Sequence, residues 1–158
     1  MPLLEATVSA FLELEAALLD ELGAVKAERE WLRRLDGPRL LQRAEARDAF
    51  NARLARLLAA ARGRLRDLCV EARADGETLE ALECAAPEAG ARVRAAVERS
   101  KVAARRLDEL QRFNRDVTQR ALDLVKRLSQ RLPVKGAAYS RTGAATSLPR
   151  AVTHSRSA

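Results

Sequence analysis

The sequence has few of the residues on which most catalytic and metal sites depend. Its 158 residues include one histidine, two cysteines and 3% aromatic residues. The histidine, His154, stands in a Ser/Thr/Arg-rich stretch, and neither Cys69 nor Cys84 has a second Cys or His at the spacing of a metal site. Phosphate-binding loops, nucleophile elbows and HExxH motifs are also missing. We therefore expect no enzyme activity, no metal and no cofactor.

The sequence also lacks long apolar runs and an N-terminal targeting pattern. Charged residues recur throughout, so no stretch reaches the roughly 18 apolar residues that a membrane span needs. The first residues carry no basic region, and three acids occur by Glu15, which argues against a secretory signal or transit peptide. These features predict a cytoplasmic protein without membrane insertion, whose two cysteines stay reduced.

β-Branched and aromatic residues are scarce, whereas leucine, alanine, arginine and glutamate dominate and only seven glycines and five prolines interrupt them. This composition is typical of long helices and disfavours a β-sheet architecture. We predict an all-α fold, an antiparallel long-helix bundle or coiled-coil hairpin over residues 1–132. A disordered, flexible basic tail would follow over residues 133–158.

Apolar residues recur every seven positions in the first part of the chain. One heptad position over residues 3–35 is occupied by Leu4, Phe11, Leu18, Val25 and Leu32, which predicts a helix with a packing seam. Asp36-Gly37-Pro38 favours the end of this helix and the start of another. The second helix is predicted over residues 38–73, with Arg47 and Asn51 at positions where the pattern favours apolar groups.

A connection is predicted over residues 75–90, which contain glycine and proline breakers, five acids and no base. One short helical turn should form within it, around Leu79 and Leu82. The third helix is predicted over residues 91–132. At about 1.5 Å per residue it would span roughly 60 Å, too long for a compact small domain to cover. Part of its apolar stripe should therefore remain available to a partner.

The net charge of +7 is concentrated in the C-terminal part of the chain. Residues 1–90 carry 13 bases and 17 acids, residues 91–132 carry 12 bases and 5 acids, and the tail adds four bases. A nucleic-acid binder would use such a basic face to neutralise phosphates. Nucleic acid is nevertheless an unlikely partner, because acids alternate with the bases and the aromatic interleaving of single-strand binders is missing.

Two C-terminal motifs suggest a family. The stretch ELQRFNRDVTQRALDLVKRL, followed by PVKGAAYSRTG, resembles the C-terminal signature of FlgN family flagellar type III export chaperones. That signature has an LN-x-x-N-like pattern on a helix and a YG-x-x-G-like motif after a break. Leu110, Gln111 and Asn114 match the first pattern, and Tyr139 to Gly143 match the second. Gln111 replaces an asparagine and Ser140 a glycine.

The resemblance implies a cytoplasmic chaperone that binds hook-associated flagellar proteins, at the junction of hook and filament, and delivers them to the export gate. The expected client-binding residues are Leu110, Asn114, Val117, Leu124 and Leu128. The only tyrosine, Tyr139, would dock on the cytosolic domain of the gate. No small-molecule substrate is expected.

Several alternatives remain open at this stage. Asn114 lies at a seam position, where asparagine commonly fixes helix register rather than contacting a partner. Tyr139 could be incidental in a tail. The whole chain could instead be a structural coiled-coil stalk component of the secretion apparatus, or a basic helical nucleic-acid-binding protein.

Overall fold

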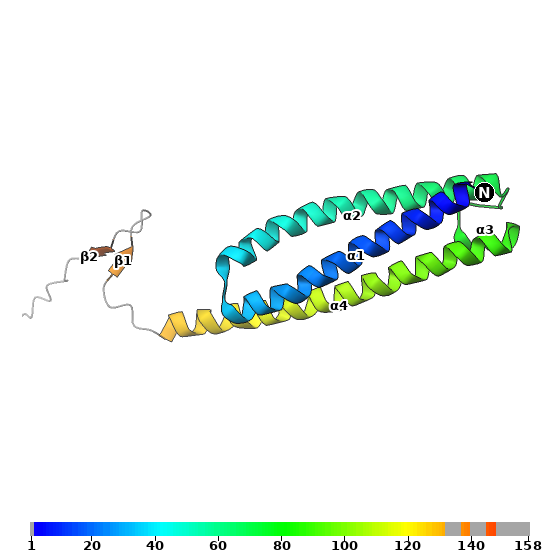
Figure 1. Cartoon of the computed structure of the whole chain (residues 1–158). Helices are drawn as coiled ribbons and strands as arrows, with labels where there is room; N and C mark the ends of the chain where they lie inside the picture. The colour runs from blue at the N-terminus through cyan, green and yellow to red at the C-terminus, as the bar shows by residue number, and fades with distance from the viewer. Residues whose placement is uncertain (1, 132–136, 140–144, 148–158) are drawn as a thin grey trace, which may run out of the picture. The chain divides into compact units, whose positions relative to one another are not determined.

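The computed structural model describes residues 2–131, 137–139 and 145–147, and the elements follow one another as four helices and two short strands (Figure 1). The helices are α1 (Pro2–Arg34), α2 (Gly37–Glu71), α3 (Leu79–Ala85) and α4 (Pro87–Arg131), and the strands are β1 (Ala137–Tyr139) and β2 (Ala145–Ser147). The chain divides into two compact units, Met1–Thr118 and Gln119–Ala158. The predicted all-α fold is confirmed. No helix within the described residues is long and apolar enough to cross a membrane.

The turn between α1 and α2 forms where the Asp-Gly-Pro sequence predicts it. Leu35 has a φ of 52°, a left-handed conformation that ends α1. The side chain of Asp36 then accepts a hydrogen bond from the backbone N–H of Arg39 and caps α2, whose first turn contains Pro38. The chain reverses direction here, so α2 runs antiparallel to α1 (Figure 1).

The connection between α2 and α4 is tighter than the sequence analysis predicts. Thr78 caps α3 through a hydrogen bond from Ala81 N–H, so the expected helical turn around Leu79 and Leu82 is present. However, α4 begins at Pro87 rather than at residue 91, because proline suits the first turn of a helix. Gly90, which looked like a breaker, lies inside α4. A Cβ built on Gly90 would come within 2.7 Å of Glu83 Cα, so this glycine permits α3 and α4 to approach closely.

The main hydrophobic core lies at the end of the bundle where α3 joins α2 to α4. Leu68 of α2, Leu82 of α3 and Val93 of α4 are fully buried there, and the apolar stripe of α1 packs against them. The predicted heptad residues Leu4, Phe11, Leu18 and Val25 are all buried. Away from this end, the middle of α2 contributes only partly buried side chains such as Phe50 and Leu54.

The two cysteines are unbridged: Cys69 is buried and Cys84 is exposed. Burial raises the pKa of the Cys69 thiol, and the nearby Glu77 carboxylate raises it further. The Cys69 Sγ also lies 3.5 Å from the carbonyl oxygen of Thr78, to which it donates. A neutral thiol packed in this way is a core residue and a poor nucleophile.

The second unit contains a strand pair that the sequence analysis does not anticipate. β1 and β2 pair antiparallel, with Ala138 opposite Thr146 and Tyr139 opposite Ala145. The sequence analysis places no secondary structure at these six residues. The other positions of the expected disordered tail lie outside the described residues.

Candidate functional site

Two polar side chains fix the packing of α4 on α1. Ser100 Oγ donates to the carbonyl oxygen of Phe11 over 2.9 Å, and Asn114 Nδ2 donates to that of Val25 over 3.0 Å. Both bonds join residues 89 positions apart, so the two helices run parallel and keep one register over two heptads. Both polar side chains are buried. Asn114 Nδ2 therefore meets its acceptor only in this register, whereas Ser100 Oγ also lies 3.1 Å from the carbonyl oxygen of Ala96 in its own helix.

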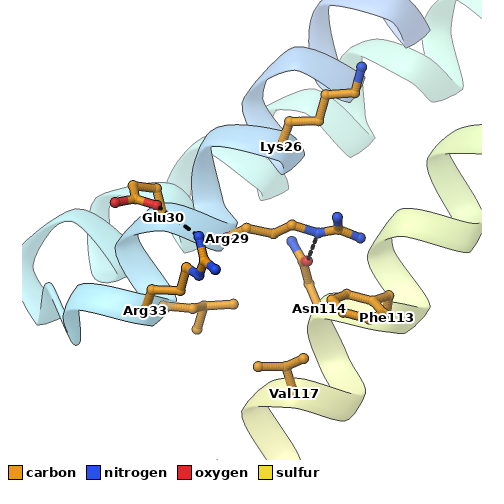
Figure 2. Close-up of a pocket in the computed structure, with 8 residues that line it drawn as sticks. Lys26, Arg29, Glu30, Arg33, Phe113, Asn114 and Val117 are labelled. Carbon is orange, nitrogen blue, oxygen red and sulfur yellow. Dashed lines mark hydrogen bonds and ion pairs between the residues drawn. The ribbon is translucent and has the colours of Figure 1, made fainter.

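A groove lies beside Asn114, between the C-terminal part of α1 and the same stretch of α4 (Figure 2). Its volume is about 520 Å³. Apolar side chains from both helices line it, namely Leu32 from α1 and Phe113 and Val117 from α4. Phe113 is 51% exposed and Val117 39% exposed, which leaves an apolar surface open to solvent at the end of the unit opposite its main core.

Arg29 crosses this groove from α1 to α4 and is held at two points. Its Nε donates to Asn114 Oδ1 over 3.2 Å, and its guanidinium carbon lies 4.2 Å from the centroid of the Phe113 ring (Figure 2). The contact with the ring is a cation–π interaction. Both contacts restrict the guanidinium before any ligand arrives, and within the described residues Arg29 has no carboxylate partner.

Three of the four charged residues that line the groove are basic. They are Lys26, Arg29 and Arg33, whereas Glu30 is the single acid. Glu30 already pairs with Arg34 over 2.9 Å and lies 3.7 Å from Arg33. Lys26 makes no ion pair with any residue that the structure describes. The groove therefore combines an apolar surface with a net positive charge.

The five predicted client-binding residues differ in burial and belong to both units. Leu110 is partly buried against the core. Asn114 is 3% exposed, and its amide is engaged at both ends, by Val25 and Arg29, which favours the register interpretation of this residue. Val117 lines the groove, while Leu124 and Leu128 belong to the second unit, where both are more than half exposed.

The part of α4 within the second unit has no buried face. Every residue from 121 to 130 is exposed, and four of them are large hydrophobic residues: Leu122, Leu124, Val125 and Leu128. Leu124 and Leu128 agree with the expectation that α4 leaves part of its apolar stripe uncovered, whereas Leu122 and Val125 were not part of the predicted stripe. The other predicted site residue of this unit, Tyr139, lies in β1, and the position of its side chain is outside what the structure describes.

A buried charged cluster between α1 and α2 is not predicted from the sequence. Glu21 of α1 pairs with Arg43 of α2, and Glu28 of α1 accepts a 2.6 Å hydrogen bond from Arg47. Arg43 Nε also lies 3.5 Å from Glu28. The polar interruption of the α2 stripe at Arg47 was the available signal, because a charge on an apolar stripe needs a facing opposite charge. Glu21 and Glu28 supply it.

Nothing in this architecture has the form of a metal centre: among the residues described, no group of three or more His, Cys, Asp or Glu side chains could hold a metal ion. Comparison with known proteins finds no matching family model, no matching curated protein and no matching solved structure. The groove and the exposed face of α4 are therefore interpreted from their own chemistry.

Proposed function

We propose that this chain is a cytoplasmic flagellar type III export chaperone that binds hook-associated proteins and delivers them to the export gate. The observation that carries the proposal is the uncovered apolar surface of α4, with four large hydrophobic residues exposed between positions 121 and 130. Monomeric proteins rarely expose such groups together unless a partner covers them. The FlgN-like motifs around Asn114 and Tyr139 supply the identity of the partners.

Binding would proceed by capture of an amphipathic helical segment of the client. Client segments that are disordered before assembly expose apolar surface, and covering that surface would prevent premature association. Burial of about 600 Å² of apolar surface at roughly 25 cal/mol per Å² corresponds to a gross gain near 15 kcal/mol. Ordering and association costs offset most of this gain, which leaves affinities in the micromolar to nanomolar range. No catalysis, metal or nucleotide is required.

A structural stalk component is the first alternative function. A stalk would have its apolar stripes mutually covered, so the exposed residues of α4 favour a binding protein. The second alternative is a basic nucleic-acid binder. Its affinity for duplex DNA would fall steeply with salt because of counterion release, and a salt series with generic duplex DNA measures this directly.

The test of client capture uses the double variant Val117→Asp, Leu124→Asp. Both side chains are exposed, so the variant should keep its helix content by circular dichroism and lose binding to hook-associated proteins in pull-down and titration experiments. The matched control is Leu41→Asp with Val70→Asp, which places two acids at exposed apolar positions of α2. Equal loss of binding in the control, or retained binding in the test variant, would contradict the proposal.

Docking on the export gate is tested separately at Tyr139. If this tyrosine contacts the gate, Tyr139→Ala should weaken binding to the cytosolic domain of the gate by about 1 to 3 kcal/mol. Affinity for the client should stay within about threefold, since no client contact is lost. Isothermal titration against each partner measures both effects. Unchanged affinity for the gate would make Tyr139 an incidental residue.

A further inference from the structure

We propose that the groove between α1 and α4 in the Met1–Thr118 unit selects an acidic amphipathic helix, whose apolar side chains are flanked by carboxylates. This inference rests on the proposed function, because it specifies the chemistry of the segment that the chaperone would capture. It concerns side chains that play no part in the match to the FlgN-like motifs, namely Lys26, Arg29 and Arg33 of α1 and Phe113 of α4, which occupies a variable position of the first motif.

Arg29 is preorganised to bind a carboxylate. With its Nε bonded to Asn114 Oδ1 and its carbon 4.2 Å from the centroid of the Phe113 ring, the guanidinium has little conformational freedom left to lose. Its terminal nitrogens have no carboxylate partner within the described residues. A planar guanidinium with two free N–H groups matches a carboxylate in a bidentate geometry. A partner carboxylate would therefore find a donor that is already oriented.

The other charged residues of the groove also favour an acidic partner. Lys26 and Arg33 lie seven residues apart on α1, on either side of Arg29 along the helix (Figure 2). Glu30, the one acid among the described residues that line the groove, pairs with Arg33 and Arg34. A helix docked along α1 would thus meet three bases over two turns. Complementary acids on that helix would be attracted, whereas lysines or arginines would be repelled.

The shape of the apolar surface favours a helical partner. Leu32, Phe113 and Val117 come from two parallel helices, and a depression between two helices accepts the side-chain ridge of a third. A helix with apolar residues at i, i+3, i+4 and i+7 would cover these side chains and place its flanking residues next to the bases. The expected occupant is therefore a helix rather than an extended strand or a small molecule.

Charge also excludes the tail of this chain as the occupant. Residues 133–158 contain four bases and no acid, so they would be repelled from Arg29 and its neighbours. The acidic stretch of this chain, residues 75–90 with five acids and no base, has complementary charge and could dock only from a second copy. A second copy as occupant would be recognised by self-association of the protein in solution.

The experiment measures binding of three fluorescent helical peptides to the full chain by anisotropy. Each is about 18 residues long, enough for a stable amphipathic helix. The first has leucines at i, i+3, i+4 and i+7 flanked by glutamates, the second has lysines in place of the glutamates, and the third keeps the glutamates but replaces the leucines by glutamines. Wild type should bind the first peptide at least about tenfold more tightly than either of the others.

Two variants test whether the preference for the glutamate peptide arises in the groove. Lys26→Gln with Arg33→Gln should weaken binding of the first peptide by about five- to tenfold and flatten its salt dependence. Arg29→Met, which keeps an apolar contact with Phe113 but removes the guanidinium, should weaken it by about tenfold or more. The control is Arg53→Gln with Arg56→Gln, which removes two charges from an exposed part of α2 and should change the affinity less than about twofold.

The inference is overturned if the glutamate and lysine peptides bind equally, if the first peptide does not bind, or if the control weakens binding as much as the groove variants. Salt-sensitive self-association in sedimentation experiments, lost in Arg29→Met, would overturn it in favour of a second copy as occupant. Failure of this inference can be distinguished from failure of the proposed function. Clients captured through Val117 and Leu124 without any acidic preference would leave the chaperone proposal standing and remove only this inference.

Discussion

Glu21, Arg43 and Glu28 are acidic and basic side chains buried between α1 and α2. Glu21 and Arg43 are 5% and 6% exposed. Burial of charged groups costs free energy that their mutual attraction only partly offsets, so such a cluster contributes more to the specificity of packing than to net stability. Here the cluster fixes the pairing of α1 with α2 close to the turn that joins them.

Replacing Arg43 by methionine should be strongly destabilising. Glu21 would lose its partner while remaining buried, and an uncompensated buried charge costs about 3 to 5 kcal/mol. Urea denaturation followed by circular dichroism measures the change in the free energy of unfolding. The double variant Glu21→Leu, Arg43→Met should recover most of the loss. Arg53→Met, at an exposed position of α2, should stay within about 0.5 kcal/mol of wild type.

Glu83 should make the stability of the protein sensitive to acid. Hydrogen bonds from the Arg94 guanidinium, together with its charge, hold the pKa of the Glu83 carboxyl below its usual range. A carboxyl whose pKa is lower in the folded state stabilises that state above its unfolded pKa. This stabilisation is lost as the pH falls through the folded value.

The corresponding variant is Glu83→Gln. Its melting temperature should lie below that of wild type at pH 7, and the difference should shrink as the pH falls through the lowered pKa of the Glu83 carboxyl, because both side chains are uncharged below it. Thermal unfolding at a series of pH values measures the trend. Glu109→Gln, at an exposed position of α4, is the matched control. A difference that stays constant with pH would show that the Glu83–Arg94 pair does not act through ionisation.

At the scale of the elements, glycines in helices have different roles in this chain. A Cβ on Gly90 would overlap Glu83, with its Cα 2.7 Å away, whereas a Cβ on Gly63 of α2 would meet nothing within 4 Å. Gly90→Ala should therefore separate α3 from α4 and destabilise the protein. Gly63→Ala should stabilise it by about 0.5 to 1 kcal/mol, because alanine has the higher helix propensity. Chemical denaturation of both variants measures the sign of the change in the free energy of unfolding. A stabilising effect of Gly90→Ala would contradict the close approach of α3 and α4.

Sequence periodicity predicts the elements of this fold better than their contacts. The seven-residue repeat of α1 and the Asp-Gly-Pro break mark α1 and α2 to within two residues of Pro2–Arg34 and Gly37–Glu71, because local geometry decides both. Gly90 was misinterpreted as a breaker, since only the distance to Glu83 reveals its packing role. Likewise, Asn114 was recognised as a seam residue, but its contact with Arg29 depends on which helix faces α4.

The groove could not be predicted from the sequence either, because its residues come from two helices far apart in the chain. Val117 was singled out as an apolar residue of a long stripe, but Lys26, Arg29 and Arg33 belong to a helix about 85 positions earlier, as the Arg29–Asn114 bond shows. Solvent-facing bases on an amphipathic helix have no distinguishing pattern. Only the parallel register of α1 and α4 places them beside Phe113.

At the scale of the whole Met1–Thr118 unit, packing is uneven along the bundle. Most of the large, fully buried apolar residues lie near α3, whereas Val25 is the one at the opposite end, which is held mainly by charged groups and by Asn114. Amide hydrogen exchange should reflect this difference, because local opening is easiest where few apolar contacts must break. Backbone amides of residues 40–58 in α2 should exchange faster than those of residues 61–70. Uniform protection along α2, measured by mass spectrometry, would contradict this expectation.

The bonds from Ser100 to Phe11 and from Asn114 to Val25 each span 89 residues, and this separation has a consequence for biosynthesis. At about 5 to 20 residues per second, roughly 4 to 18 s pass between synthesis of the two halves of each contact. During that interval α1 can pair only with α2, and its other face stays in water. The nascent chain would then itself be an unprotected amphipathic hairpin, open to ribosome-associated chaperones until residues 93–114 leave the exit tunnel.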